Sequence, residues 1–77
     1  GNQFEMPSLQ GKKFGDVFRE LQAAGWRGTP DQLHRKDKNT TDLGRVDEVA
    51  QQSIHSGEVI KRDEDITVTV YVFNLLP

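Results

Sequence analysis

The chain of 77 residues contains no cysteine. Disulfides, zinc sites with thiolate ligands and cysteine nucleophiles are therefore excluded. Small secreted domains are often held together by disulfides, so composition alone favours a cytosolic domain. No apolar run approaches the roughly 18 residues that a membrane span needs. The chain also begins without the pattern of a signal peptide. We therefore expect either a cytosolic domain or a domain cut from a longer protein.

An excess of basic side chains is also missing. Ten Lys and Arg residues face 12 Asp and Glu residues, for a formal net charge of −2. Domains that bind nucleic acid usually carry a clear basic excess, so we expect no nucleic-acid partner. Apolar residues make up only 34% of the chain, and so short a chain buries only about 60–65% of its unfolded surface. We expect one thin core without a deep pocket, which disfavours most enzymes and favours a surface-binding or spacing role.

Two segments show clear hydrophobic periodicity. Apolar side chains recur at helical spacing from residue 14 to residue 24, where they are Phe14, Val17, Phe18, Leu21 and Ala24. This spacing predicts an amphipathic helix that ends at Gly25. The segment DITVTVYVF, residues 65–73, alternates aliphatic residues with threonine and aromatic residues. It predicts a strand with one face on the core.

Weaker signals complete the predicted fold. Residues 29–34 and 46–52 are interpreted as strands, and the polar segment KDKNTTDLG, residues 36–44, as a loop. Together these elements predict an α+β fold with one amphipathic helix packed on a three-stranded antiparallel β-sheet. Residues 1–5 are interpreted as a linker or frayed start, residues 6–73 as the domain, and residues 74–77 as a C-terminal tail.

Metal and catalytic sites are disfavoured by the spacing of their candidate residues. His34 and His55 are far apart in sequence, and no cysteine can complete a zinc site. Asp42 occupies the position where a calcium-binding loop needs glycine, although four oxygen-bearing residues otherwise fit that loop: Asp37, Asn39, Thr41 and Glu48. Ser53, His55 and Ser56 are too close in sequence to form a nucleophile–base pair. We expect no metal, no cofactor and no catalytic residue.

The stretch MPSLQGKKFGDVFRELQAAGWRG, residues 6–28, resembles the opening of a PASTA domain. This repeat is attached to penicillin-binding proteins and to bacterial Ser/Thr kinases. The matching positions cover about residues 4–73 and are Met6, Pro7, Leu9, Gly11, Gly25, Trp26, Val49, Gln52, Gly57, Ile60 and Ile66–Val70. The segments GNQFEMPSLQG, AAGWRG and VIKRDEDITV are most similar to the last extracellular repeat of the actinobacterial, mycobacterial-type PASTA kinases. The sequence departs from the family at Ile54, where a proline is frequent, and in the longer polar segment 35–45.

The resemblance implies an extracellular sensor module of a bacterial membrane Ser/Thr kinase. Such a module lies in the cell envelope as part of a single-pass membrane protein and binds peptidoglycan fragments, or muropeptides, beside neighbouring PASTA repeats. The kinase active site lies elsewhere in such a protein, and we expect the isolated domain to be a monomer. The alternative is a structural spacer or protein-interaction module, in a kinase or a penicillin-binding protein, that binds no ligand.

Stem peptides of peptidoglycan carry free carboxylates, which guanidinium and ammonium groups match. The expected ligand-binding cations are, in order of expected importance, Arg62 and Arg45, and then Arg27 and Lys61. Trp26 is a candidate platform for a flat or sugar ligand, although a tryptophan beside a helix end is more typical of a core. The resemblance does not single out one arginine as the carboxylate contact.

Overall fold

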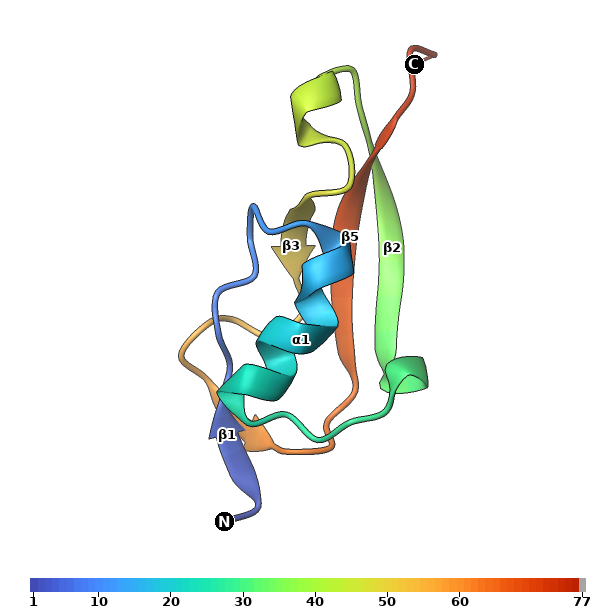
Figure 1. Cartoon of the computed structure of the whole chain (residues 1–77). Helices are drawn as coiled ribbons and strands as arrows, with labels where there is room; N and C mark the ends of the chain where they lie inside the picture. Colours follow the sequence, from blue (N-terminus) through green and yellow to red (C-terminus); the bar gives the residue numbers. More distant parts are fainter. Residues whose placement is uncertain (77) are drawn as a thin grey trace.

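The computed structural model describes residues 1–76 and is elongated, with principal extents of 46 × 20 × 17 Å. The two ends of the chain lie at opposite ends of the long axis (Figure 1). In chain order the helix and strands are β1 (Gln3–Glu5), α1 (Phe14–Ala24), β2 (Leu33–Thr40), β3 (Val49–Gln52), β4 (Val59–Lys61) and β5 (Ile66–Phe73). There are also two short 3₁₀ helices, η1 (Pro30–Gln32) and η2 (Leu43–Arg45).

The strands form two sheets. β5 is the central strand of a three-stranded sheet in the order β2-β5-β3, in which β2 runs parallel and β3 antiparallel to it. β1 and β4 form a separate antiparallel pair. The predicted α+β class is therefore confirmed, but the predicted single three-stranded antiparallel sheet is wrong, because the larger sheet is mixed and a second sheet exists.

β2 accounts for most of that error. Its sequence, LHRKDKNT, has exposed side chains at all six interior positions. Because this edge strand is held by backbone pairing, its side chains need not be apolar. Its sequence therefore lacks the alternation of apolar and polar residues that predicts a strand. The prediction of a loop over residues 36–44 is consequently wrong for residues 36–40, which pair with β5. Asp37 and Asn39 lie on this extended strand and do not wrap around an ion.

The N-terminal residues also differ from expectation. β1 pairs with β4, placing Phe4 opposite Ile60. Phe4 is only 6% exposed and belongs to the hydrophobic core. The interpretation of residues 1–5 as a linker or frayed start is therefore wrong for Gln3–Glu5, since burial of Phe4 anchors them. At the other end, Asn74 N–H donates to Thr40 O at 3.0 Å, and position 77 of the expected tail lies outside the described residues.

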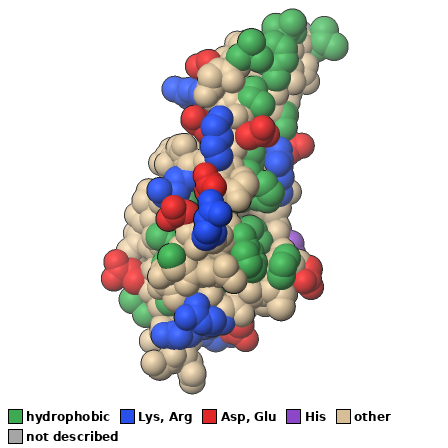
Figure 2. All heavy atoms as spheres, in the orientation of Figure 1, with side chains coloured by type: hydrophobic (Ala, Val, Ile, Leu, Met, Phe, Trp, Pro, Cys, Tyr) green, Lys and Arg blue, Asp and Glu red, His purple; other side chains and the backbone are tan. Residues whose placement is uncertain are grey.

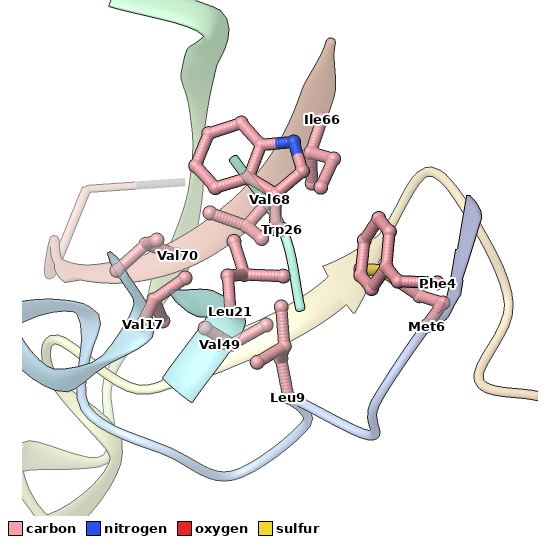
Figure 3. Close-up of a cluster of buried hydrophobic side chains, with 10 residues drawn as sticks. All are labelled: Phe4, Met6, Leu9, Val17, Leu21, Trp26, Val49, Ile66, Val68 and Val70. Carbon is pink, nitrogen blue, oxygen red and sulfur yellow. The ribbon is translucent and has the colours of Figure 1, made fainter. Parts of the chain in front are cut away.

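The helix has the predicted bounds and buries the predicted stripe. Val17 and Leu21 are fully buried with Ile66, Val68 and Val70 of β5. Figure 3 shows these side chains pointing toward one another, with Trp26 beside them. The helix ends in a Schellman motif, in which Gly25 N–H donates to Gln22 O and Trp26 N–H to Leu21 O. Gly25 has φ 118°, a conformation that glycine adopts without strain.

Gln52 ties the segment that precedes the helix to β3. Its Oε1 accepts a hydrogen bond from Leu9 N–H at 2.8 Å. Its Nε2 donates to Pro7 O at 3.0 Å and to Ile54 O at 2.8 Å. These three bonds satisfy backbone groups that no strand partner reaches, so the glutamine has a structural reason for its place in the motif.

Candidate ligand-binding site

Three of the four expected cations gather at one end of the molecule. Arg27, Lys61 and Arg62 line a shallow hollow of about 370 Å³ together with Asn2 and Asp63. We call these five residues the basic hollow. Figure 2 shows a patch of Lys and Arg side chains toward this lower end, near the N-terminal tip. The structure therefore brings together residues that are up to 61 positions apart in the sequence.

Arg27 is positioned by the end of α1. Its backbone N–H donates to Arg62 O at 2.7 Å. Its Nη1 donates to Gln22 O at 3.2 Å and to Trp26 O at 2.9 Å, which satisfies carbonyls at the C-terminal end of the helix. The guanidinium has five N–H donors. Its remaining donors are available to an anion.

Arg62 is positioned by the strand pair β1–β4. Its backbone N–H donates to Asn2 O at 3.0 Å, and its Nε donates to Gln3 O at 3.3 Å. Its two terminal nitrogens make no hydrogen bond within residues 1–76, and they form the edge that matches a carboxylate. Pairing of β1 with β4 therefore orients the arginine that sequence reasoning ranked first.

The charge of the basic hollow is positive. Three cations surround one carboxylate, Asp63. Within the described residues, none of these four charged groups takes part in an ion pair. The hollow is open to solvent, so the three cations could hold a carboxylate or another anion only weakly.

Arg45 does not belong to this hollow. It lies in η2, toward the opposite end of the molecule (Figure 1), with its guanidinium 5.8 Å from the centre of the Tyr71 ring. Its Nε is 3.7 Å from Asp42 Oδ2. With Tyr71 and Glu48 it lines a different hollow of about 230 Å³. The four cations expected from the sequence are thus divided between two surfaces.

Trp26 is a core residue. It is fully buried, and its ring packs edge-on against the ring of Phe18, with 5.6 Å between the ring centres. Its Nε1 donates a hydrogen bond to Glu64 O at 2.8 Å. Its place among the ligand-binding candidates is therefore wrong, because a ring without exposed surface cannot stack on a ligand. The core interpretation of this tryptophan is confirmed.

A polar cluster that the sequence did not indicate adjoins the hollow. Gln32 Nε2 donates to Asp63 O at 2.7 Å and to Asp65 Oδ1 at 3.0 Å. His34 Nε2 lies 3.0 Å from Asp65 Oδ2. The hydrogen bond with His34, followed by that from Gln32, holds the pKa of Asp65 below its ordinary value. This cluster fixes the turn from Asp63 to β5.

Asn2 and Asp63 also went unnoticed as lining residues of the basic hollow. Asp63 follows Lys61 and Arg62 directly, and that adjacency was the one available signal. Among residues 1–76 no group of three His, Cys, Asp or Glu side chains could hold a metal ion. No helix in the same range is long and apolar enough to cross a membrane.

Comparisons with known proteins agree on one family. The family model described as the PASTA domain matches residues 4–72. The chain is 37% identical over 70 residues to Serine/threonine-protein kinase PknB of Mycolicibacterium smegmatis, which covers 90% of this chain and 11% of the kinase. A crystal structure of the three-PASTA-domain of a Ser/Thr kinase from Staphylococcus aureus aligns with a TM-score of 0.73. That alignment has 15% identity and covers 94% of this chain and 34% of the other.

Proposed function

The chain belongs to the PASTA domain family, and on that premise we propose that it is the extracellular sensor module of a bacterial membrane Ser/Thr kinase. The module is non-catalytic, and it binds peptidoglycan fragments so that the state of the cell wall reaches the kinase. The similarity to a mycobacterial kinase supports this parent. Because the chain spans only 11% of that relative, the kinase domain and membrane segment belong to other parts of such a protein.

The basic hollow is the observation that carries the proposal. Arg27, Lys61 and Arg62 present three positive charges beside one carboxylate, Asp63, on an open surface. Stem peptides of peptidoglycan end in free carboxylates, and guanidinium groups bind carboxylates through paired N–H donors. The hollow therefore has the charge and the donors to hold the end of such a peptide.

Binding at this site is expected to be weak. An exposed pair between an arginine and a carboxylate contributes about 0.2–1 kcal/mol, and a desolvated two-pronged pair contributes more. A few such contacts on an open surface give dissociation constants in about the micromolar to millimolar range. Affinity should fall as salt is raised, because mobile ions screen exposed charges.

Titration of the ¹⁵N-labelled domain with synthetic muropeptides, followed by NMR, tests the proposal. We expect shifts of amides around Arg27 and Arg62, and weaker binding by Arg27→Ala and Arg62→Ala. Arg45→Ala is the matched control, because it removes the same group at the opposite end of the molecule. Amide shifts that stay fixed at millimolar muropeptide would remove the sensor function from this domain. Equal losses of affinity in all three variants would show that the basic hollow is not the binding site.

The second candidate function, a spacer or protein-contact module, is favoured by a different observation. Large apolar side chains are exposed at the end opposite the basic hollow, where they appear at the top of Figure 2; they are Leu43, Phe73, Leu75 and Leu76. Such clustering marks contact surfaces. A neighbouring PASTA repeat fits this end, since the similar Staphylococcus aureus structure contains three PASTA domains. Dispersed NMR spectra without muropeptide shifts would favour this function over the sensor.

A further inference from the structure

β2 leaves one of its two edges without a partner strand. It is an outer strand in the order β2-β5-β3, and within residues 1–76 no other strand lies beside its far edge (Figure 1). We call this the free edge. All eight residues of β2 pair with β5 in an unbroken register. The other outer strand, β3, has only four residues, and its register is interrupted between Val49 and Gln51. Short length and bulges protect edge strands from further pairing, so β3 is protected in this way and β2 is not.

The free edge presents the backbone groups of every second residue of β2. Thr40 O accepts a hydrogen bond from Asn74 N–H, directly after β5, so the backbone of Thr40 points toward β5. Along a strand, successive residues direct their N–H and C=O groups to opposite edges. Arg35, Asp37 and Asn39 therefore direct their N–H and C=O groups away from β5. A further strand placed beside β2 would meet a row of backbone donors and acceptors.

The side chains along the free edge differ in charge between the two faces of the sheet. Arg35 and Asp37 lie on the side of α1, where the Arg35 guanidinium stacks on the ring of Phe14. Arg35 Nε donates to Asp37 Oδ1 at 3.1 Å, so these two charges compensate each other. Lys36 and Lys38 lie on the opposite face, are exposed, and take part in no ion pair within residues 1–76. The free edge thus carries two unneutralised positive charges on one face alone.

The charges of β2 oppose its pairing with a second copy of itself. Two identical edge strands related by a twofold axis run antiparallel, and the axis passes through one residue, which then lies opposite its own copy. With the axis at Asp37, the two aspartates are opposite each other, and Lys36 of each copy is opposite Lys38 of the other. With the axis at Arg35, Lys36 or Lys38, that cation is opposite its own copy. Like charges directly opposite each other are destabilising. The free edge is therefore suited to a different strand, of opposite charge.

We infer that the free edge binds an extended protein segment with carboxylates at alternate positions, which joins the sheet as a fourth strand. Antiparallel addition is the more stable form per residue. Arg35, Asp37 and Asn39 then form the hydrogen-bonded pairs. Lys36 and Lys38 form the other pairs, in which opposite Cα atoms are about 4.5 Å apart and side chains are closest. Carboxylates two residues apart on the partner match the lysines, which are about 6.6 Å apart along the strand. Such a partner is recognised by its backbone and by alternate side chains. This surface and its partner are independent of the basic hollow and of the proposed function.

A capped peptide of sequence Thr-Val-Glu-Thr-Glu-Val-Thr is the probe, because its glutamates fall opposite the two lysines when its central threonine is opposite Asp37. Added to the ¹⁵N-labelled domain, it should shift the amides of β2. It should also slow the exchange with water of the amide hydrogens of Arg35, Asp37 and Asn39. The amides of Lys36 and Lys38 point toward β5 and should exchange slowly with or without the peptide. This alternation distinguishes an added strand from a carboxylate that binds only the lysine side chains.

Two double variants test the role of charge. Lys36→Gln/Lys38→Gln should bind the peptide about two- to thirtyfold more weakly, as expected for the loss of two exposed ion pairs. Both lysines are exposed, so the melting temperature of this variant should stay at the wild-type value. Arg27→Gln/Lys61→Gln makes the same change of charge in the basic hollow and should leave peptide binding unaltered. Equal losses in the two variants would overturn the inference, because the peptide would then respond only to the overall charge.

Two methylated peptides test the backbone pairing. N-methylation of the central threonine removes the N–H that bonds to Asp37 O and places a methyl group against the free edge. It should weaken binding about tenfold or more. N-methylation of the first glutamate is the matched control, because its N–H points away from β2, and it should leave the affinity unchanged. Equal affinities of the two methylated peptides would overturn the inference. So would unchanged exchange at Arg35, Asp37 and Asn39 in millimolar peptide, or wild-type affinity in the lysine variant.

Discussion

At the scale of single residues, Gln52 ties the segment before the helix to β3, and no strand ladder joins these two. Gln52→Ala removes three hydrogen bonds and leaves Leu9 N–H, Pro7 O and Ile54 O without these partners. Since each bond contributes about 1 kcal/mol and unpaired groups cost more, we expect a loss of about 2–4 kcal/mol. Urea unfolding measures this. Gln51→Ala is the matched control, because Gln51 is exposed and makes no side-chain hydrogen bond among the described residues; an equal loss there would contradict the role of Gln52.

Asp65 gives the protein a dependence on acid. Its pKa is lowered in the folded state by the hydrogen bonds with His34 and Gln32. A carboxyl with a lowered pKa stabilises the fold above its unfolded pKa, which is about 3.9. That contribution is lost as pH falls through the folded pKa. Asp65→Asn should therefore reduce the fall in melting temperature between about pH 5 and pH 2. If the melting temperature of Asp65→Asn fell with acid as steeply as that of the wild type, the Asp65 cluster would not form in solution.

The residues of the candidate site were only partly foreseeable. Arginine and lysine were expected because carboxylates select them, and Arg27, Lys61 and Arg62 do share one hollow. The separation of Arg45 could not be foreseen, since it follows from the unexpected pairing of β2 with β5. Trp26 could have been assigned to the core from its place after the helix-ending glycine, where the chain turns back over the helix.

At the scale of elements, α1 and β5 hold the core together. Leu21 is fully buried in the cluster that includes Val68 and Val70. Leu21→Ala should cost about 2–5 kcal/mol, as truncations of buried leucine do. In a small domain that is a large part of the free energy of unfolding, so the melting temperature should fall strongly. Leu75→Ala is the matched control, since Leu75 is 71% exposed; equal melting temperatures for both variants would exclude Leu21 from the core.

The same two elements were the ones that the sequence predicted with correct bounds or nearly so. A long periodic stripe identifies α1, and four aliphatic residues in alternation identify β5. β1 and β4 are three residues each, too short to show a period. β2 has a polar sequence, and its parallel partner lies 33 positions away, so neither its existence nor its direction has a local signal.

At the scale of the whole molecule, stability comes from apolar burial and backbone pairing. Ten buried residues form one cluster that spans the helix, both ends of the N-terminal segment and the larger sheet. Treatment with EDTA should therefore leave the melting curve unchanged, with a sodium salt of equal ionic strength as the control. A large loss of stability would restore the calcium-loop interpretation of Asp37 and Glu48.

The elongated arrangement has a mechanical consequence. The chain enters at one end of the long axis and leaves at the other, directly after β5 (Figure 1). The hydrogen bonds of each strand pair run across the strands. Tension along the long axis therefore loads all the bonds of one pair at the same time, in shear. β5 resists over eight residues paired with β2, whereas β1 resists over three residues paired with β4. Under load, β1 yields first and withdraws Gln3 and Asn2 from Arg62, so stretching dismantles the basic hollow while the three-stranded sheet keeps its shape.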